Sequence, residues 1–328
     1  MKKVKDYIII TLVTLGAAML YEKYVRHEKK INELNDQSLI QQYLLNDTSL
    51  DVIKKPILWI HVKHEKNARL WQNFNSRNSE YLNQPYIFLT IRSIIRHCGN
   101  SFQICLIDDD SFNVLLPDWN DDVNMLAEPI KNHTRSLALS KVLYKYGGFL
   151  VPNSFICTKN LISLYESSLR NKNMFVCENQ PDSNVTQQTY YFPDMGFIGC
   201  IKESCIMNNF SDKVNTLVSN DFTNSMDFTG ECNRILYEMV INNKIALVTG
   251  DKIGIKKTDN KPLMIEELME SSYIELPNNI FGVYIPSDKI LKRRKYEWFA
   301  NLSISQALSS NTLIGKFLLV SHEGMCSA

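Results

Sequence analysis

The stretch of residues 134–157 constrains the fold of this chain more than any other part of the sequence. Apolar residues recur at helical spacing over 137–143, and a glycine pair follows at 147–148. Two glycines can adopt positive φ angles and end a helix without strain. Residues 149–151 are typical of a short buried strand, which the polar residues 152–154 end. Helix, glycine turn and buried strand in this order predict an α/β fold, in which ligands bind beyond the carboxyl ends of strands.

Other segments continue the alternation of strands and helices. The 328 residues, 45% of them hydrophobic, suffice for one large α/β domain with a full core. Short apolar runs predict strands at 57–62, 102–107, 174–178 and 245–248. Amphipathic runs predict helices at 86–97, 161–169, 204–218 and 232–242.

Residues 143–148, Leu-Tyr-Lys-Tyr-Gly-Gly, resemble the sugar-binding-region segment of GT-A-fold glycosyltransferases of the capsular-polysaccharide-synthesis and mannosyltransferase-like type. In that family a buried strand follows and ends in an Asp-x-Asp motif. The resemblance extends more loosely over residues 57–290. It implies a GT-A-like mixed sheet flanked by helices, and transfer of a sugar from a nucleotide-sugar donor to a glycan or protein acceptor. It also implies that Gly147, Gly148, Asn153 and Ser154 border the substrate.

Four side chains depart from the family pattern. Ser136 and Leu139 stand where the family has a helix aspartate and an arginine, and Pro152 and Ser154 replace the two metal-binding aspartates. A proline cannot ligate through its side chain, and a hydroxyl is a poor substitute for a carboxylate. The divalent cation (manganese or magnesium) that the resemblance implies would therefore need other ligands.

The absence of the two metal-binding aspartates leaves three alternatives. Basic side chains, namely Arg135, Lys141 or the run 292–295, could clamp the donor phosphates directly. Asp108, Asp109 and Asp110 could instead hold the cation from the neighbouring strand. In the third case no transfer occurs, and the chain is an inactive pseudo-glycosyltransferase that binds a sugar or a partner; a non-enzymatic interaction domain without that ligand is a further alternative.

The three aspartates directly follow the strand predicted at 102–107. Adjacent carboxylates repel one another, and a divalent cation would relieve that repulsion. The alternative is that Asp110 or Ser111 caps a helix that runs to Leu115. His61 ends the first predicted strand and is a candidate substrate contact, although a single histidine there is more often an ordinary core or surface residue.

Three further carboxylates are candidates for catalysis. Asp194 lies in the segment 190–200, which resembles the family segment that lines the acceptor side, and could act as a base. Its alternative role is that of a turn residue after a proline. Asp227 and Glu231 flank a predicted Thr-Gly turn before the helix at 232–242, where Glu231 could equally well serve the helix dipole.

The first 21 residues predict a membrane anchor. Residues 7–21 carry no charge and would span ~22 Å as a helix, and snorkelling lysines at 5 and 23 could extend this toward a bilayer core of ~30 Å. A cleaved signal peptide is the alternative. Lysines and arginines on both sides of the run leave the membrane side undetermined. A helical stem at 22–55, a GT-A-like domain at 56–291 and a basic and aromatic closing segment at 292–328 complete the expected organisation.

Charge and cysteine content exclude some classes of function. With 36 basic and 35 acidic residues, the net charge of +1 provides no field to gather nucleic acid, so no nucleic-acid partner is expected. The eight cysteines are scattered without a C-x-x-C pair, which does not favour a zinc site. Several lie within apolar runs and would behave as small hydrophobic residues, and disulfides would require an oxidising compartment.

Overall fold

The computed structural model describes residues 55–62, 84–178, 191–220 and 225–323. All of them belong to the larger of two compact units, residues 45–328. The predicted anchor (1–21) and all but the last residue of the predicted stem (22–55) lie outside the described residues. Within the described ranges, no helix combines the length and the apolar character needed to cross a bilayer.

Six strands form one mixed sheet in the order β2-β1-β3-β6-β5-β7. β6 pairs antiparallel with both β3 and β5, and the other pairings are parallel. The strands are β1 (Ile57–His61), β2 (Gln103–Ile107), β3 (Gly148–Leu150), β5 (Met174–Glu178), β6 (Pro193–Cys200) and β7 (Ala246–Val248). A second, two-stranded sheet joins β4 (Phe155–Cys157) to β8 (Gly282–Tyr284). The predicted mixed α/β architecture is confirmed.

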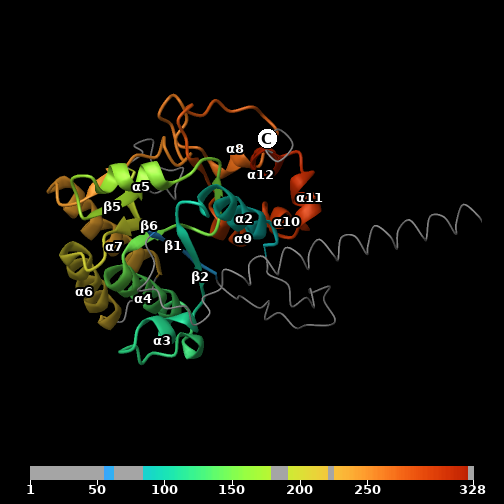
Figure 1. Ribbon diagram of the computed structural model, residues 1–328. Helices are drawn as coiled ribbons and strands as arrows, with labels where there is room; N and C mark the ends of the chain where they lie inside the picture. Colours follow the sequence, from blue (N-terminus) through green and yellow to red (C-terminus); the bar gives the residue numbers. More distant parts are fainter. Residues whose placement is uncertain (1–54, 63–83, 179–190, 221–224, 324–328) are drawn as a thin grey trace, which may run out of the picture. The chain divides into compact units, whose positions relative to one another are not determined.

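Helices flank the sheet; five of them overlap the predicted helices, whereas the helices that follow β7 were not predicted. The helices are α2 (Tyr86–Cys98), α3 (Ser111–Leu115), α4 (Ile130–Tyr146), α5 (Ile162–Leu169), α6 (Cys205–Ser219), α7 (Ser225–Ile241), α8 (Ile265–Leu268), α9 (Ser287–Lys292), α10 (Glu297–Ala300), α11 (Ile304–Leu308) and α12 (Leu313–Glu323), with a short 3-10 turn, η2, at Val123–Met125. Figure 1 shows their arrangement around the strands.

The helix α7 begins seven residues earlier than predicted, so the expected Thr229-Gly230 turn was wrong. Phe228 and Cys232 are both buried, at 2% and 0% exposure, and their spacing of four places them on one helical face. Thr229 and Gly230 lie on the exposed side of the same helix. Packing of the apolar face against the core therefore outweighs the local preference of a Thr-Gly pair for a turn.

Alternation along the strands produces two cores, one on each face of the sheet. On one face Trp59, Cys105 and Leu150 pack with the apolar sides of α4, α6 and α7. On the other face the ring of Phe149 lies 5.0 Å from Phe175 and 5.4 Å from Phe197, measured between centroids. Both faces of the central strands are thus covered, as expected of a largely parallel sheet.

The C-terminal helices form a second cluster against α2, β4 and β8. Figure 1 shows α9 to α12 gathered beside α2. Buried residues of this cluster come from distant parts of the chain, including Tyr86, Ile156, Phe299 and Leu318. The boundary predicted at 291–292 falls inside α9. The described part of the predicted closing segment shares its core with α2, which precedes β3 in the chain, and with β4 and β8, which follow it.

The glycine pair allows β3 to lie close to β1. Gly147 and Gly148 have φ angles of +69° and +105°, which favour glycine. A Cβ atom on Gly148 would lie 2.4 Å from the carbonyl oxygen of Ile57, and one on Gly147 would lie 2.4 Å from the amide nitrogen of Lys202. The indole Nε1 of Trp59 donates a hydrogen bond of 2.8 Å to the Gly147 carbonyl. Any side chain at these positions would push β3 away from its neighbours.

Substitution of two glycines tests this account. Gly148→Ala is expected to lower the free energy of unfolding by about 3 kcal/mol or more, because the added methyl group meets backbone at a strained φ. Gly230→Ala is the matched control, since a Cβ there meets no atom within 4 Å and lies in a helix. It is expected to raise the free energy of unfolding by about 0.5–1 kcal/mol. Urea unfolding followed by tryptophan fluorescence measures both; a destabilised Gly230→Ala would contradict the helical assignment.

Candidate functional site

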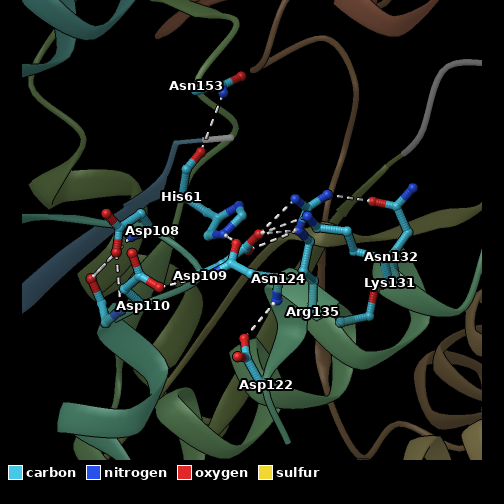
Figure 2. A network of polar contacts seen from close by, with 12 residues as sticks. His61, Asp108, Asp109, Asp110, Asp122, Asn124, Lys131, Asn132, Arg135 and Asn153 are labelled. Atoms are coloured by element: carbon cyan, nitrogen blue, oxygen red, sulfur yellow. Dashed lines mark hydrogen bonds and ion pairs between the residues drawn. The ribbon is translucent and has the colours of Figure 1, made fainter. Parts of the chain in front are cut away.

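Polar residues gather where the parallel strands β1, β2 and β3 end. These strands are neighbours in the sheet, so the residues at their carboxyl ends lie side by side. His61 ends β1, Asp109 follows β2, and Asn153 follows β3. The amide of Asn153 donates a hydrogen bond of 3.2 Å to the His61 carbonyl (Figure 2). We call this region the carboxyl end of the sheet, and it is where α/β folds bind their ligands.

Asp109 is the centre of the network. Arg135 donates to it through Nε, at 2.8 Å to Oδ1, and through Nη2, at 2.7 Å to Oδ2. The Nε2 atom of His61 lies 3.1 Å from Oδ1, and the Nζ atom of Lys131 lies 3.8 Å from Oδ2. The side chains of Asp109, Arg135 and His61 are between 6% and 9% exposed, whereas that of Lys131 is 22% exposed. Figure 2 shows the Asp109 carboxylate directed at the guanidinium of Arg135.

The helix α4 holds the cations of this network. Leu137, Ala138 and Val142 form the face of α4 that packs in the core shared with α6 and α7. Arg135 lies about one turn before that face and is itself buried, with Nη1 donating 3.0 Å to the Oδ1 atom of Asn132. The guanidinium is therefore fixed by partners on two sides, a geometry that suits a bidentate carboxylate contact.

The network keeps Asp109 ionised. Burial alone would raise the pKa of this carboxyl, but the hydrogen bonds from His61 and Arg135 and the charge of the guanidinium outweigh it and hold the pKa well below its usual range. The ring of Phe112 stacks on His61, with centroids 5.6 Å apart, and shields the pair from water. A buried carboxylate with these partners is a fixed negative charge at neutral pH.

The two neighbouring aspartates turn to other partners. Asp108 accepts hydrogen bonds from the backbone nitrogen and the hydroxyl of Ser111, at 2.9 and 2.6 Å, and so caps the start of α3. Asp110 accepts a bond of 2.6 Å from Asn124 at the surface. The helix that the capping alternative expected does run to Leu115, but the predicted cap was wrong: Asp110 occupies the N-cap position without a side-chain capping bond, and Asp108 binds the first helical N–H instead. In the described part of the chain, no three histidine, cysteine or acidic side chains are grouped as metal ligands would be.

The 152–154 turn, formed by Pro152, Asn153 and Ser154, is tied into the fold. The Ser154 side chain is buried, at 2% exposure, and its hydroxyl donates 2.7 Å to the Ile285 carbonyl. The hydroxyl of Thr90 donates to the Asn153 carbonyl. A divalent cation requires oxygen ligands that are free to face it. The residues of this turn do not fit a divalent cation, and no step of a reaction is assigned to one here.

Three other expected substrate contacts lie away from the carboxyl end of the sheet. Gly147 caps the end of α4 and Gly148 begins β3, so both lie at the amino end of that strand, where they serve packing. The Lys141 ammonium lies 5.2 Å from the ring centroid of Trp119. Lys141 follows Arg135 by six residues on α4. At ~1.5 Å per residue, these two basic residues are separated by ~9 Å along the helix axis.

The three candidate catalytic carboxylates occupy different surroundings. Asp194 lies near the start of β6, the end of that strand next to the carboxyl end of the sheet, and accepts 2.8 Å from the Gly196 nitrogen, as a turn aspartate does. Asp227 is exposed in the first turn of α7. Glu231 is partly exposed and pairs with Arg234 at 2.7 Å one turn further along the same helix. The structure therefore brings Asp194 to the sheet's carboxyl end and leaves the other two on a helix surface.

Sequence reasoning missed a second polar cluster at the carboxyl end of the sheet. Glu178 ends β5, and its Oε2 atom lies 2.5 Å from both the Gly250 nitrogen and the Lys256 ammonium. Lys256 in turn lies 3.9 Å from the ring centroid of Tyr191. Glu178 could have been found by the criterion that identified the aspartates after β2, because each is a carboxylate at the end of a predicted strand. Lys131 and Lys256 gave no comparable signal, because lysines on helices and in loops are usually solvated.

A small apolar cavity lies where the family pattern would have charged helix residues. It has a volume of about 40 Å³ between α4, α6, β3 and β6. Its lining includes Ser136 and Leu139, together with Leu150 and Phe210. Ser136 and Leu139 are uncharged and partly exposed, so the helix carries no charge at this edge of the cavity. The departures from the family pattern are thus consistent with one another in three dimensions.

Comparison of the sequence with models of known protein families finds no match, and no curated protein matches it either.

The low pKa of Asp109 predicts how stability changes with pH. A carboxyl whose pKa is depressed in the folded state contributes stability that is fully present above its unfolded pKa of ~3.9. That contribution is lost as the pH falls below it. Asp109→Asn, which leaves the buried Arg135 with only the longer 3.6 Å ion pair to the exposed carboxylate of Glu128, is expected to cost about 3 kcal/mol at pH 7. The difference from wild type should shrink as the pH falls from about 5 to 2.

Urea unfolding of both proteins at pH 7 and pH 3 measures this effect. Asp110→Asn is the matched control, because Asp110 is exposed and its carboxylate accepts a hydrogen bond from the surface residue Asn124. It is expected to change the free energy of unfolding by less than about 0.5 kcal/mol. An Asp109→Asn penalty that stays constant between the two pH values would show that the ion pair does not hold the carboxyl in its charged form.

Proposed function

We propose that this chain is a membrane-anchored glycosyltransferase-like protein, which transfers a sugar from a nucleotide-sugar donor to a glycan or protein acceptor. The observation that carries the proposal is the meeting of His61, Asp109 and Asn153 with two basic side chains of α4 at the carboxyl end of a mixed sheet. The residue-for-residue resemblance of the segment 143–148 to GT-A glycosyltransferases supports the sugar-nucleotide class. A GT-A-like fold and the anchor at residues 1–21 are part of the proposal.

Sugar transfer requires the enzyme to stabilise a departing diphosphate. Positive charge develops on the sugar ring in the transition state, while negative charge builds on the leaving group. Lys131 is the cation of the network that reaches solvent, since the guanidinium of Arg135 is buried and already contacts Asp109 and Asn132. We assign to Lys131 the charge-assisted contact with the diphosphate. Asp194, at the other side of the carboxyl end of the sheet, is the candidate base for the acceptor hydroxyl.

A second candidate function is binding without turnover, as in a pseudo-glycosyltransferase. The observation that favours it is the burial of Ser154, whose hydroxyl is consumed by the Ile285 carbonyl at the position of a family metal ligand. In this case the carboxyl end of the sheet would hold a sugar, a nucleotide-sugar or a partner and would not transfer a sugar. The two candidates share a binding site and differ in catalysis.

A panel of uridine and guanosine diphosphate-sugars separates the candidates. Isothermal titration is expected to detect binding of at least one donor, and product analysis to detect transfer or hydrolysis of the same donor. Each measurement is made with manganese and with a chelator. A requirement for the ion would show that the site acts through a bound divalent cation. Binding without turnover supports the pseudo-enzyme, and the absence of both binding and turnover across the panel would sink both proposals.

The role of Lys131 is tested with a matched pair of lysine variants. Lys131→Ala is expected to weaken the affinity for the nucleotide diphosphate by about 10-fold or more, because a hydrogen bond to a charged group contributes roughly 1.5–3 kcal/mol. Lys141→Ala, on the same helix but stacked over Trp119, should leave the affinity within about 2-fold. Equal losses in the two variants, measured by titration calorimetry, would mean that the ligand does not contact the α4 end of the network.

A further inference from the structure

Two cysteines from distant segments meet in the core. The sulfur atoms of Cys98, the last residue of α2, and Cys157, the last residue of β4, lie 3.9 Å apart. Both residues are fully buried, and 59 positions separate them in the sequence. Seven cysteines lie in the described ranges, and among them these two alone form a hydrogen bond with each other. Their meeting is a tertiary feature that the scattered cysteine pattern did not indicate.

We propose that Cys98 and Cys157 form a disulfide bond when the protein folds under oxidising conditions. A disulfide has a sulfur–sulfur distance of ~2.05 Å, so the two sulfurs must approach by about 1.9 Å. Rotation of a cysteine side chain about its Cα–Cβ bond moves the sulfur by more than this distance. The inference is independent of the sugar-transfer proposal.

The bond would fasten a segment that is already held by polar contacts. Thr90 on α2 donates to the Asn153 carbonyl, and the backbone nitrogen of Cys157 donates 2.9 Å to the Ser93 hydroxyl. These contacts and the sulfur pair join α2 to residues 153–157 along their length. The disulfide would therefore fasten the last residue of β4 to the last residue of α2.

The chemistry requires an oxidant, which is a small-molecule disulfide such as oxidised glutathione. One protein thiolate attacks a glutathione sulfur and expels the other glutathione as a thiolate. The second protein thiolate then attacks the mixed disulfide and expels the remaining glutathione. Two protein thiols are oxidised, one disulfide is reduced, and the two protons end on the released glutathione thiols. The hydrogen bond with Cys157 lowers the pKa of Cys98, whereas burial raises the pKa of Cys157, so Cys98 is the better first nucleophile.

Peptide mapping of the full chain tests the proposal directly. The protein is refolded with mixed reduced and oxidised glutathione, blocked with iodoacetamide in denaturant and digested without reduction. Trypsin alone leaves Cys98 and Cys105 on one peptide, so chymotrypsin is added to cut after Phe102. The expected product links residues 97–102 to a peptide that contains Cys157. Recovery of both cysteines in the alkylated form would overturn the proposal, whatever the behaviour of any variant.

Thermal unfolding provides an independent measurement. Oxidised wild type is expected to melt about 5 °C or more above the same protein after reduction, since a cross-link across a loop of this length constrains the unfolded chain. The difference should vanish in Cys98→Ala and in Cys157→Ala. Cys177→Ala is the matched control, because Cys177 is fully buried on β5 and, among the described cysteines, only Cys98 and Cys157 are hydrogen-bonded to each other. Retention of the difference in either Cys98→Ala or Cys157→Ala would contradict the assignment.

Discussion

The close approach of β3 to β1 is the constraint on which the rest of this structure depends. At Gly148 the carbonyl of Ile57 occupies the space in which a side chain would begin. Because no side chain intervenes, β3 pairs with β1 on one side and with β6 on the other. This pairing sets where α4 ends and where the 152–154 turn begins. The positions of Arg135 and Asn153 follow from it, since each lies a fixed number of residues from the glycine pair.

Electrostatics then closes the carboxyl end of the sheet around Asp109. Its carboxylate is nearly buried and would be costly to keep charged by itself. The bidentate contact with Arg135 and the hydrogen bond with His61 remove that cost and join β1, β2 and α4. The same contacts occupy the guanidinium of Arg135, which would otherwise be the strongest phosphate-binding group at the carboxyl end of the sheet. What remains for a ligand is the partly exposed Lys131, and this is why the proposed diphosphate contact rests on it.

The departures from the glycosyltransferase pattern form one coherent change in the core. Ser136 and Leu139 line an apolar cavity, and Ser154 donates its hydroxyl to the backbone of Ile285. An aspartate at position 154 would place a charge in a buried environment, since Ser154 is only 2% exposed. A site reorganised in this way agrees with either donor binding by basic groups or binding without turnover.

The sequence alone determined the parts of this protein that depend on local pattern. Continuous apolar runs and helical periodicity placed β1, α2, β2, β5 and α6 within one or two residues, since burial of strands on both faces and of one helix face dictates these patterns. The glycine pair fixed the junction of α4 and β3. The sequence also located His61, Asp109, Arg135 and Asn153 among its candidate residues.

Only the tertiary structure decided which of these candidates meet. Local pattern assigned the three aspartates 108–110 to one site, but a turn of the backbone directs each to a different partner. It placed a turn at Thr229-Gly230, but core contacts of Phe228 and Cys232 extend the helix through it. The contacts of Glu178 with Lys256 and of Cys98 with Cys157 join residues 78 and 59 positions apart. Such contacts arise from the packing of whole elements, which no short stretch of sequence encodes.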